Sequence, residues 1–299
     1  MKAVVIGSIN MDFNSTVDHL PVKGETITAG RFKESPGGKG ANQAVALSRL
    51  GGDVTMIGVV GGDGTGKSLI EVLKDAGIPD GGIKVADTAT GSAFITVDKQ
   101  GSNTIVVYPG ANYQLDMDWV EGFKDEIAVA DYVVAQMEVP TQTVEDSIKL
   151  AHELGTRVIL NPAPARPIAE GIYPMTDVIA PNETELKILT GTEDIRRGAG
   201  LLLAKGVKSV VVTLGSQGCF YTDGKEEITA EGFKVDAVDS TAAGDAFIAG
   251  LAFKLGICGV REALEFANAV GAVTVTKPGA QDSIPTYKEV QGFLRRRKK

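Results

Sequence analysis

The chain contains few of the residues on which disulfide frameworks, metal sites and histidine catalysis depend. Its 299 residues include two cysteines, Cys219 and Cys258, and two histidines, His19 and His152. The cysteines are too few and too far apart in sequence for a disulfide framework or a metal knuckle, and we interpret them as core thiols in a reducing cytoplasm. Neither histidine has a neighbour at a spacing typical of catalysis or metal binding. We interpret both as surface residues.

Positive charge and long apolar runs are scarce as well. The formal net charge is -8, and the only basic run is the tail at residues 295–299, which we interpret as a solvated helix end. A nucleic-acid partner is therefore not expected. No apolar run reaches the roughly 20 residues that cross a bilayer. The first apolar run, residues 3–6, stops at Gly7, which is typical of a strand and not of a signal peptide, so no membrane partner is expected either.

What the sequence does contain is a repeated alternation of strands and helices. A composition of 43% hydrophobic and 23% charged residues suits one large globular domain or a domain with an insertion. Repeated strand–helix units predict a right-handed, doubly wound α/β fold with a mostly parallel sheet, whose ligands bind beyond the carboxyl ends of the strands. We expect strands at residues 3–6, 54–60, 132–135, 158–160, 178–180 and 209–213, and helices at 37–50, 65–76, 144–154, 183–189, 197–205 and 244–255.

Two segments interrupt this alternation. Residues 24–32 and 92–108 alternate polar and apolar side chains, with a hairpin turn predicted at 99–102. They predict a small inserted antiparallel β-sheet that acts as a lid. Because a half-exposed sheet favours a cover, we also predict a homodimer joined through the lids. The predicted α/β body comprises residues 1–11, 36–89 and 111–299, and the predicted lid comprises residues 12–35 and 90–110.

Residues 239–247, DSTAAGDAF, predict an anion site at the start of a helix. Ala242, Ala243 and Gly244 have almost no side chain, so their backbone N–H groups can approach one bound group at the positive end of that helix. Asp245 lies in the first helical turn, where a carboxylate is favourable for dipole reasons alone. Beside a phosphate site it could instead take a proton from an attacking hydroxyl.

A second glycine-rich turn resembles a phosphate-binding motif more closely. Residues 61–68, GGDGTGKS, match the P-loop pattern letter for letter between a predicted strand and a predicted helix. Taken alone, this match predicts a P-loop NTPase. We favour a structural turn with a solvated Lys67, because no later strand ends in the apolar run and aspartate that would hold Mg²⁺.

The helix start at residues 37–43, GGKGANQ, could serve a ligand or only the fold. Its glycines allow close approach to the backbone, Lys39 could pair with a phosphate, and Asn42 could hydrogen-bond a ligand. Glu138 is either a solvated loop charge or part of a polyol site, because carboxylates and amides exchange hydrogen bonds with vicinal hydroxyls. Asn10 and Asp12, which follow the first predicted strand, would complete that site.

Three further features admit a structural and a nucleotide-binding interpretation. Asn182 and Glu185 have capping-box spacing, but they could also lie near phosphate oxygens and a Mg²⁺ shell. The turn at residues 213–218, TLGSQG, could contact a nucleotide through its backbone or be a plain turn. Asn268 lies among small residues that could admit an adenine ring, or it is an exposed polar residue of a helix.

Six segments together resemble the ribokinase branch of the PfkB sugar-kinase family along essentially the whole chain. Each segment alone is weakly specific, whereas six in the family's order are highly specific. They are GSINMD (7–12), GGKGANQAVA (37–46), NPAPA (161–165), PNETE (181–185), TLGSQG (213–218) and DSTAAGD (239–245).

The resemblance implies transfer of a phosphoryl group from ATP to O5 of D-ribose, which yields ribose 5-phosphate and ADP. It implies that Asp245 is the catalytic base and that Ala242, Ala243 and Gly244 form the anion hole. It further implies a ribose site at Asn10, Asp12, Gly38, Lys39, Asn42, Glu138 and Asp245, and an ATP site at Asn182, Thr213, Gly215, Ser216, Gly218, Gly244 and Asn268. It implies that Glu185 binds Mg²⁺ indirectly. It also implies a site for a monovalent cation, K⁺, formed partly by backbone carbonyls, at Asp239, Thr241, Thr274, Lys277, Gly279 and Ser283.

The chain departs from this family at two positions. Some relatives carry a histidine in place of Asn268, and relatives vary at the residue that matches Lys67. The alternatives are a kinase of the same fold that acts on fructose, 2-keto-3-deoxygluconate or a nucleoside, and a non-catalytic sugar or nucleotide sensor.

Overall fold

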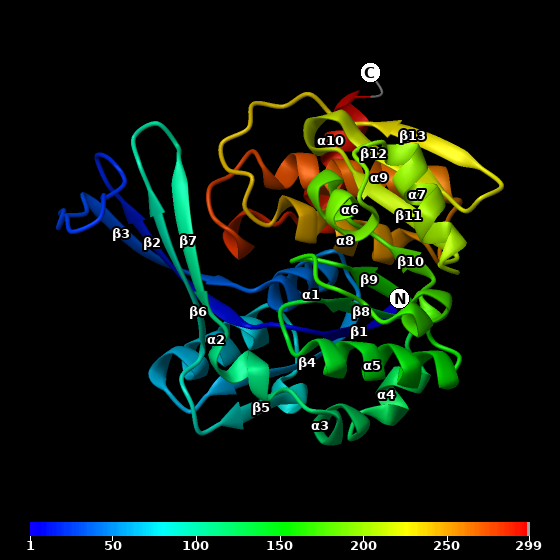
Figure 1. The fold of residues 1–299 in the computed structure, drawn as a ribbon, viewed down its shortest axis with the longest axis horizontal. Coiled ribbons are helices and arrows are strands. Elements are labelled where there is room, and N and C mark those ends of the chain that lie inside the picture. Colours follow the sequence, from blue (N-terminus) through cyan, green and yellow to red (C-terminus); the bar gives the residue numbers. More distant parts are fainter. Residues whose placement is uncertain (298–299) are drawn as a thin grey trace.

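The chain forms a large and a small β-sheet (Figure 1). The computed structural model describes residues 1–297; residues 298–299, the end of the predicted solvated tail, lie outside the described residues. Within residues 1–297 the large sheet has nine strands in the order β13-β12-β11-β10-β9-β8-β1-β4-β5. Its neighbouring strands are parallel except at β11–β12 and β12–β13, which confirms the predicted doubly wound, mostly parallel sheet. The strands are β1 (Lys2–Ile6), β4 (Asp53–Gly61), β5 (Ile83–Ala86), β8 (Tyr132–Gln136), β9 (Arg157–Asn161), β10 (Val178–Ile179), β11 (Ser209–Thr213), β12 (Gly218–Thr222) and β13 (Glu227–Glu231).

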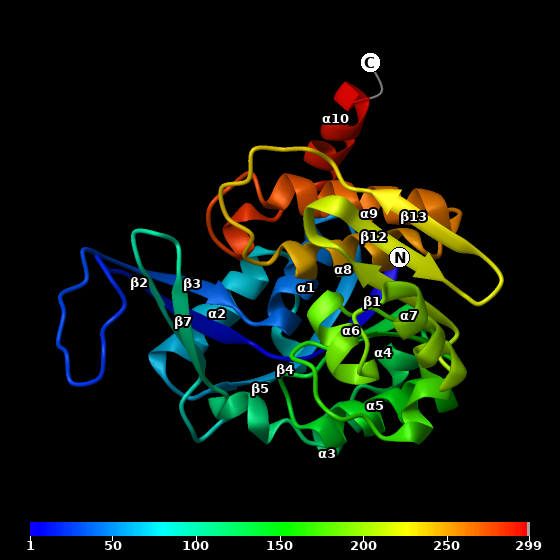
Figure 2. The ribbon, with the colours of Figure 1, turned by 45° about the horizontal axis from the view of Figure 1, so that its top comes forward.

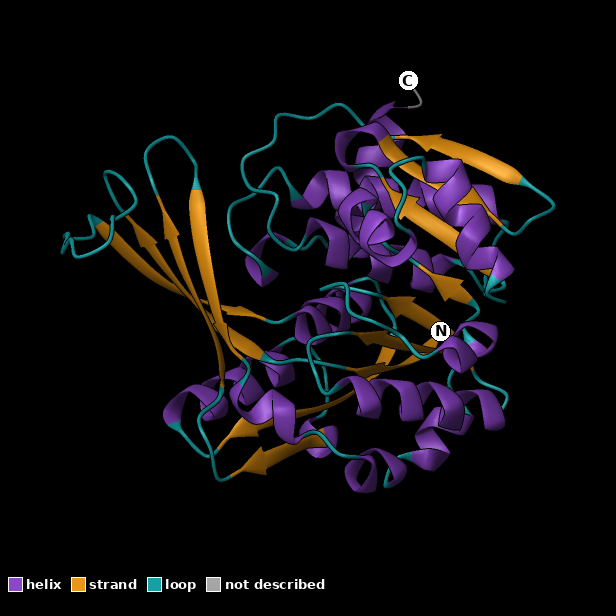
Figure 3. Cartoon of the chain, viewed as in Figure 1, coloured by secondary structure: helices purple, strands orange, loops and turns teal. Residues whose placement is uncertain are grey.

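Helices cover both faces of the large sheet (Figure 3). In β1, Ala3 and Val5 pack with α1, α2, α8 and α9, whereas Val4 and Ile6 pack with α3 to α7. A strand that is apolar on both faces therefore produces two cores. No helix of the described residues is long and apolar enough to cross a membrane. The helices are α1 (Lys39–Arg49), α2 (Gly64–Asp75), α3 (Met117–Glu121), α4 (Lys124–Ala128), α5 (Thr141–Glu153), α6 (Glu183–Thr190), α7 (Ile195–Ala204), α8 (Ala243–Lys254), α9 (Val260–Thr274) and α10 (Tyr287–Arg297).

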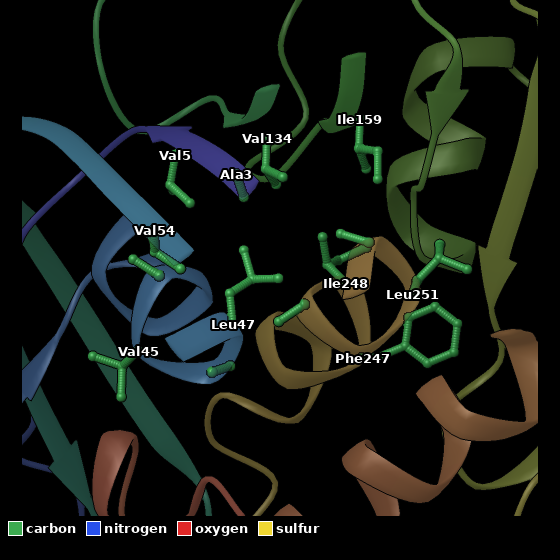
Figure 4. Close-up of a cluster of buried hydrophobic side chains, with 14 of the residues drawn as sticks. Ala3, Val5, Val45, Leu47, Val54, Val134, Ile159, Phe247, Ile248 and Leu251 are labelled. Carbon is green, nitrogen blue, oxygen red and sulfur yellow. The ribbon is translucent and has the colours of Figure 1, made fainter. Parts of the chain in front are cut away.

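Helix α8 is buried on every side and packs against α1. Leu47 of α1 shares one core cluster with Ile248 and Leu251 of α8 (Figure 4). All residues of α8 from Asp245 to Ala252 are buried, as expected for an apolar helix inside a domain. At Gly250 a Cβ would lie 3.1 Å from Cα of Ala267 in α9, so the small residue permits close helix packing. This packing fixes the position of Asp245 relative to the first turns of α1.

The small sheet projects beyond the body in both ribbon views (Figures 1 and 2). Within the described residues it has four strands in the order β3-β2-β6-β7. Asp98 and Ser102 close the predicted hairpin turn between β6 and β7. The strands are β2 (Asn10–Thr16), β3 (Arg31–Gly37), β6 (Gly91–Val97) and β7 (Asn103–Tyr108).

The pairing of this sheet differs from the fully antiparallel pairing that the sequence predicts. Strands β2–β3 and β6–β7 are antiparallel, but the central pair β2–β6 is parallel. The reason is that β2 follows β1 and β6 follows β5 after short connections, and β1 and β5 run in the same direction. Asn10 and Asp12 lie on β2 itself and not in a loop after β1, and residues 24–30 lie outside the strands.

Candidate active site

The first turn of α8 begins in a strained backbone conformation. Ala242 has φ 59°, and it is the single non-glycine residue with positive φ among residues 1–297. Within that range the N–H groups of Ala242 and Gly244 have no hydrogen-bond partner, whereas the N–H of Ala243 donates to the carbonyl of Ser240 at 3.2 Å. The turn therefore presents unpaired donors at the positive end of a buried helix, which is the arrangement that binds anions.

Two cavities meet at this turn. The larger has a volume of about 760 Å³ and the smaller of about 250 Å³, and Thr213, Ser240 and Gly244 line both. Asp245 lines the smaller cavity only. A ligand that filled both cavities would pass directly over the N-terminus of α8.

The carboxylate of Asp245 is 7% exposed and is held by two side chains of α1. Asn42 Nδ2 donates to Asp245 Oδ2 at 2.9 Å, and Gln43 Nε2 donates to Asp245 Oδ1 at 3.0 Å. Each oxygen keeps a lone pair for a further donor. The carboxylate is thus oriented and still able to accept a proton.

Lys39 is the cation of an otherwise acidic pocket. The nearby carboxylates raise the pKa of its ammonium group, Asp245 first and then Glu138, Glu185 and Asp12, against the effect of burial. Glu138 Oε2 also accepts hydrogen bonds from the backbone N–H of Lys39 at 3.0 Å and from the hydroxyl of Ser8. The ammonium group therefore stays positive at neutral pH and offsets the acidic side chains around it.

Asp12 of the small sheet lies near this group of charged side chains, and Asn10 lies two residues before it on β2. Burial, followed by the charges of Glu138 and Asp245, raises the pKa of Asp12 to about 7, although Lys39 acts in the opposite direction. Asn10 Oδ1 accepts a hydrogen bond from Asn112 Nδ2 at 2.6 Å, which leaves the amide nitrogen of Asn10 available. The structure thus brings the predicted polyol residues together from both sheets.

Gly37 and Gly38 allow this close approach. A Cβ at Gly37 would lie 2.4 Å from a carboxylate oxygen of Asp12. Gly38 has φ 85°, and a Cβ there would lie 2.7 Å from the backbone nitrogen of Asn10. Neither position has room for a side chain.

The predicted nucleotide residues border the two cavities. Asn182 and Glu185 form the predicted capping box, with both hydrogen bonds present, and both also line the smaller cavity, so the two interpretations are compatible. Asn268 is 7% exposed, which contradicts its interpretation as an exposed helical residue. Its Nδ2 donates to the carbonyls of Ala230 and Glu231. Thr213, Gly215, Ser216, Gly218, Gly244 and Asn268 all line the larger cavity.

The six residues of the predicted cation site lie on two segments that are hydrogen-bonded to each other. Asp239 Oδ2 accepts the N–H of Gly279 at 2.9 Å, and Asp239 Oδ1 accepts the N–H and hydroxyl of Thr241. Burial acts to raise the pKa of Asp239, but these hydrogen bonds lower it below its ordinary value. The side chain of Lys277 pairs with Glu289, so Lys277 can offer only its carbonyl oxygen to a cation. Thr274 and Ser283 are buried, and their hydroxyls donate to backbone carbonyls.

Sequence reasoning missed several residues of these cavities. The larger cavity is also lined by residues 232–235, which include Phe233 and Val235, by Ala237, and by Val275 directly after α9. These residues belong to no sequence motif, because they share only their position beside the cavity and not a residue type or a spacing. Their only sequence signal is proximity to the predicted motifs.

The P-loop-like turn lies in neither cavity and contains its own anion. Asp63 Oδ1 accepts the N–H of Gly66 at 2.7 Å and the hydroxyl of Thr90 at 2.6 Å, and Asp63 Oδ2 accepts the N–H of Thr90 at 2.8 Å. A carboxylate thus caps the helix N-terminus at which a P-loop holds phosphate. Lys67 is exposed. The structure supports the interpretation of this turn as structural.

Comparison with known proteins extends over nearly the whole chain. A sequence profile described as pfkB family carbohydrate kinase matches residues 1–287. The ribokinase of Haemophilus influenzae is 40% identical over 297 residues, which cover 97% of each chain, and that of Staphylococcus aureus is 39% identical over 298 residues, which cover 97% of this chain and 98% of the relative. A deoxyribokinase of Salmonella typhi is 36% identical over 302 residues, which cover 98% of this chain and 99% of the relative.

Solved structures show the same likeness. The ribokinase of Thermotoga maritima has a TM-score of 0.90 at 37% identity and covers 98% of this chain and 99% of its own. The Arabidopsis thaliana ribokinase complexed with ribose and ATP has a TM-score of 0.90 at 32% identity and covers 98% of both chains. Both the sequence profile and the full-length relatives lead to one conclusion. The chain belongs to the PfkB family of carbohydrate kinases.

Proposed function

We propose that this protein is an ATP-dependent ribokinase. The observation that carries the proposal is the position of Asp245, a buried carboxylate at the meeting point of two cavities, beside the unpaired N–H groups that begin α8. The larger cavity is lined by the predicted nucleotide residues, and the smaller cavity is lined by Lys39 and Asp245 of the predicted ribose site. The full-length ribokinase relatives, one of them solved with ribose and ATP, support ribose and ATP as the substrates.

In the proposed mechanism, Asp245 accepts the proton of the 5-hydroxyl of ribose while the oxygen attacks the γ-phosphorus of ATP in line. Asp12, Glu138 and the amides of Asn10 and Asn42 orient the sugar by accepting and donating hydrogen bonds. The first N–H groups of α8 stabilise the charge on the transferred phosphoryl group. ADP and ribose 5-phosphate then leave, and Asp245 returns its proton to water.

The residues present fit a Mg²⁺ ion that enters with ATP. Residues 1–297 contain no cluster of three or more acidic, histidine or cysteine ligands, so a divalent ion would be held chiefly by phosphates. Glu185 lines the smaller cavity, and burial raises the pKa of its carboxyl group, an effect that a nearby cation would offset. Bound Mg²⁺ would neutralise phosphate charge during transfer.

The residues also fit a monovalent cation such as K⁺. Carbonyl and hydroxyl oxygens are the ligands that K⁺ prefers, and the segments that carry Asp239, Thr274 and Ser283 offer both kinds. The N–H of Gly279 on the Asp239 carboxylate links these segments, and residues 239–241 lead directly into the first turn of α8. A bound cation would therefore strengthen the electrostatic field at the anion site.

The free cysteines Cys219 and Cys258 suit the proposed cytoplasmic location.

A coupled assay of ADP release tests the proposed function. We expect turnover with D-ribose that exceeds turnover with 2-deoxyribose, fructose, 2-keto-3-deoxygluconate and nucleosides, and we expect K⁺ to increase it. Preference for 2-deoxyribose would assign the chain to the activity of its deoxyribokinase relative. Tight binding of ribose by calorimetry without any ADP release would instead support a sensor.

The raised pKa of Asp12 predicts a pH-dependent affinity for ribose. Asp12 is mainly protonated below its pKa of about 7 and mainly ionised above it. An ionised carboxylate accepts hydrogen bonds from two hydroxyls, so we expect KM for ribose to fall as the pH rises from about 6 to about 8, by up to about tenfold. The control is Asp12→Asn, whose KM should be high and independent of pH. A wild-type KM that is constant over this range would contradict the prediction.

The exposed Lys67 should matter little for catalysis. Since Asp63 already caps the turn, Lys67→Ala should change kcat and KM for ATP by no more than about twofold, the scale of a surface substitution. Steady-state kinetics with varied ATP measure both constants. Loss of nucleotide binding would place ATP at this turn and overturn the proposed site.

We propose that residues 12–35 and 90–110, which contain most of the small sheet, form a lid domain that closes over the sugar. We also propose that two copies of the chain associate through this lid. The strand register places Phe13, Phe32, Phe94, Val106 and Tyr108 on the face opposite Asn10 and Asp12. Phe13 stacks on Phe32 and Phe94, and all but Phe13 are at least 46% exposed. An apolar face of this kind favours a second copy as its cover.

Sedimentation tests the dimer. Phe94→Asp should convert a dimer at micromolar concentration into a monomer, because it buries a charge in an apolar contact. The matched control is Val129→Asp, which changes an exposed residue after α4 and should leave the dimer intact. A monomeric wild-type protein at this concentration would refute the proposal.

A further inference from the structure

We propose that Gln43 is a positioning residue that fixes the orientation of the Asp245 carboxylate through a buried network of amides. The inference rests on the proposed function, in which Asp245 is the base. Asp245 belongs to α8 and Gln43 to α1, so the network determines how the base sits relative to the helix that carries Lys39 and Asn42.

The amide of Gln43 contacts three elements at once. Its Nε2 donates to Asp245 Oδ1 at 3.0 Å and to Asn161 Oδ1 at 3.1 Å, and its Oε1 accepts from Gln136 Nε2 at 2.6 Å. These partners lie on α8, β9 and β8. Gln43 and Gln136 are both 0% exposed. Rotating the amide of Gln43 would break all three hydrogen bonds inside the protein, where unpaired polar groups are costly.

The orientation of the amides of Gln43 and Asn161 is determined by the acceptors at two ends of the network, Asp245 and the carbonyl of Ala180. An ionised carboxylate and a backbone carbonyl can only accept hydrogen bonds. Asp245 therefore requires the NH₂ group of Gln43, and the carbonyl of Ala180 requires the NH₂ group of Asn161, which it accepts at 3.0 Å. Asn161 then offers its oxygen to Gln43, and the oxygen of Gln43 accepts from Gln136, whose own Oε1 has no hydrogen-bond partner within residues 1–297.

Gln43 differs from Asn42, the other donor to Asp245, because both polar atoms of its amide already have partners inside the protein. Asn42 Oδ1 has no hydrogen-bond partner within residues 1–297, and the sequence assigns Asn42 to the sugar. Gln43 is fully buried and lines neither of the two cavities described above. It can therefore influence the reaction only through the residues that it holds, of which Asp245 and Asn161 line the smaller cavity.

The charged groups that face Asp245 are Lys39 of α1, Asp12 of β2, Glu185 of α6 and the neighbouring Glu138 that follows β8. Each of them contributes to any pH profile of this site. Variants at Gln43 keep all four unchanged, so a difference between these variants isolates the effect of the amide.

The test compares two variants of Gln43 in the full-length enzyme with ribose and ATP. Gln43→Met keeps the side-chain length and removes the hydrogen bonds; we expect kcat to fall about 10- to 100-fold, the effect of misplacing a catalytic group, with KM for both substrates within about twofold. Gln43→Glu places a carboxyl group against Asp245. Because adjacent carboxyl groups cannot both ionise freely, the acidic limb of its kcat profile should move upward by about one pH unit or more.

Two controls separate positioning from general stability. Thr143→Val removes a buried hydrogen bond of 2.8 Å to the carbonyl of Leu115, far from the site, and should lower Tm without changing kcat. If Gln43→Met does not fold, Gln136→Met removes only the contact behind Gln43 and should lower kcat by a smaller factor at unchanged KM. Wild-type kcat in Gln43→Met, or in Gln136→Met where that variant replaces it, would overturn the inference, as would an unshifted profile in Gln43→Glu. If Asp245→Asn also kept its activity, the base assignment itself would fail.

Discussion

Replacing Asp245 by Asn should lower kcat by a factor on the order of 10²–10⁴, because an amide cannot accept the proton of the attacking hydroxyl. ATP binding should persist, since Asp245 does not line the larger cavity. An Asn at this position must also turn its NH₂ group toward either Asn42 or Gln43, and both of these already present donors. We therefore expect some weakening of ribose binding in addition to the loss of turnover.

Steady-state kinetics measure the loss, and calorimetry with a non-hydrolysable ATP analogue measures nucleotide binding. The matched control is Asp80→Asn, which makes the same chemical change at an exposed site beside Lys74 and should leave kcat unaltered. A kcat for Asp245→Asn within about tenfold of the wild-type value would show that another group is the base.

The second large effect is expected from Lys39→Met, which should lower kcat/KM for ribose by about 10²- to 10³-fold. Removing the ammonium group leaves Asp12, Glu138, Asp245 and Glu185 without the cation that offsets them. The pKa of Asp12, which Lys39 lowers, should then rise above its value of about 7. Among the described residues that line the smaller cavity, Lys39 is also the single positive side chain, so the cavity loses its positive charge.

The pH dependence distinguishes this effect from a simple loss of folding. In Lys39→Met the decrease of KM for ribose with pH should occur at a higher pH than in the wild-type enzyme. Lys124→Met, a change at an exposed position of α4, is the control and should match the wild type. An unchanged pH dependence in Lys39→Met would mean that Lys39 does not set the charge of Asp12.

Much of the large sheet and its helices follows from local pattern. Helix α8 is predicted at residues 244–255 and found at Ala243–Lys254, and β1 is predicted at 3–6 and found at Lys2–Ile6. A short apolar run that is rich in β-branched residues and ends at glycine favours a strand buried on both faces. Strand β2, NMDFNST, escaped prediction because its polar residues face the pocket and its core contacts are few. Strand β12 escaped because it begins directly at the end of the turn predicted at residues 213–218, and the edge strand β13 escaped because only one of its residues, Ile228, is buried.

Some residues of the candidate site could be predicted from local sequence pattern, and others could not. Residues in motifs, such as Lys39, Asn182 and Asp245, could be predicted because each motif places them at a helix start. The residues that hold these side chains in place could not be predicted from the sequence. Gln43 bonds to partners 93, 118 and 202 positions away in sequence, and contacts at that separation leave no periodic signal. The roles of all these residues remain predictions that the variants above will test.

The pairing of the small sheet has a mechanical consequence. Its register places Gly37, Asn10 and Gly91 side by side across β3, β2 and β6, and Tyr108 of β7 lies next to this row. All four chain connections to the body therefore leave the sheet along one line. A domain joined to the body by one connection could rotate about several axes, whereas four aligned connections restrict the rotation of the sheet to the line that joins them. In the proposed lid closure, a sugar hydroxyl held by Asn10 would lie on this axis and would move little, whereas the carboxylate of Asp12, two residues along β2, would move with the sheet.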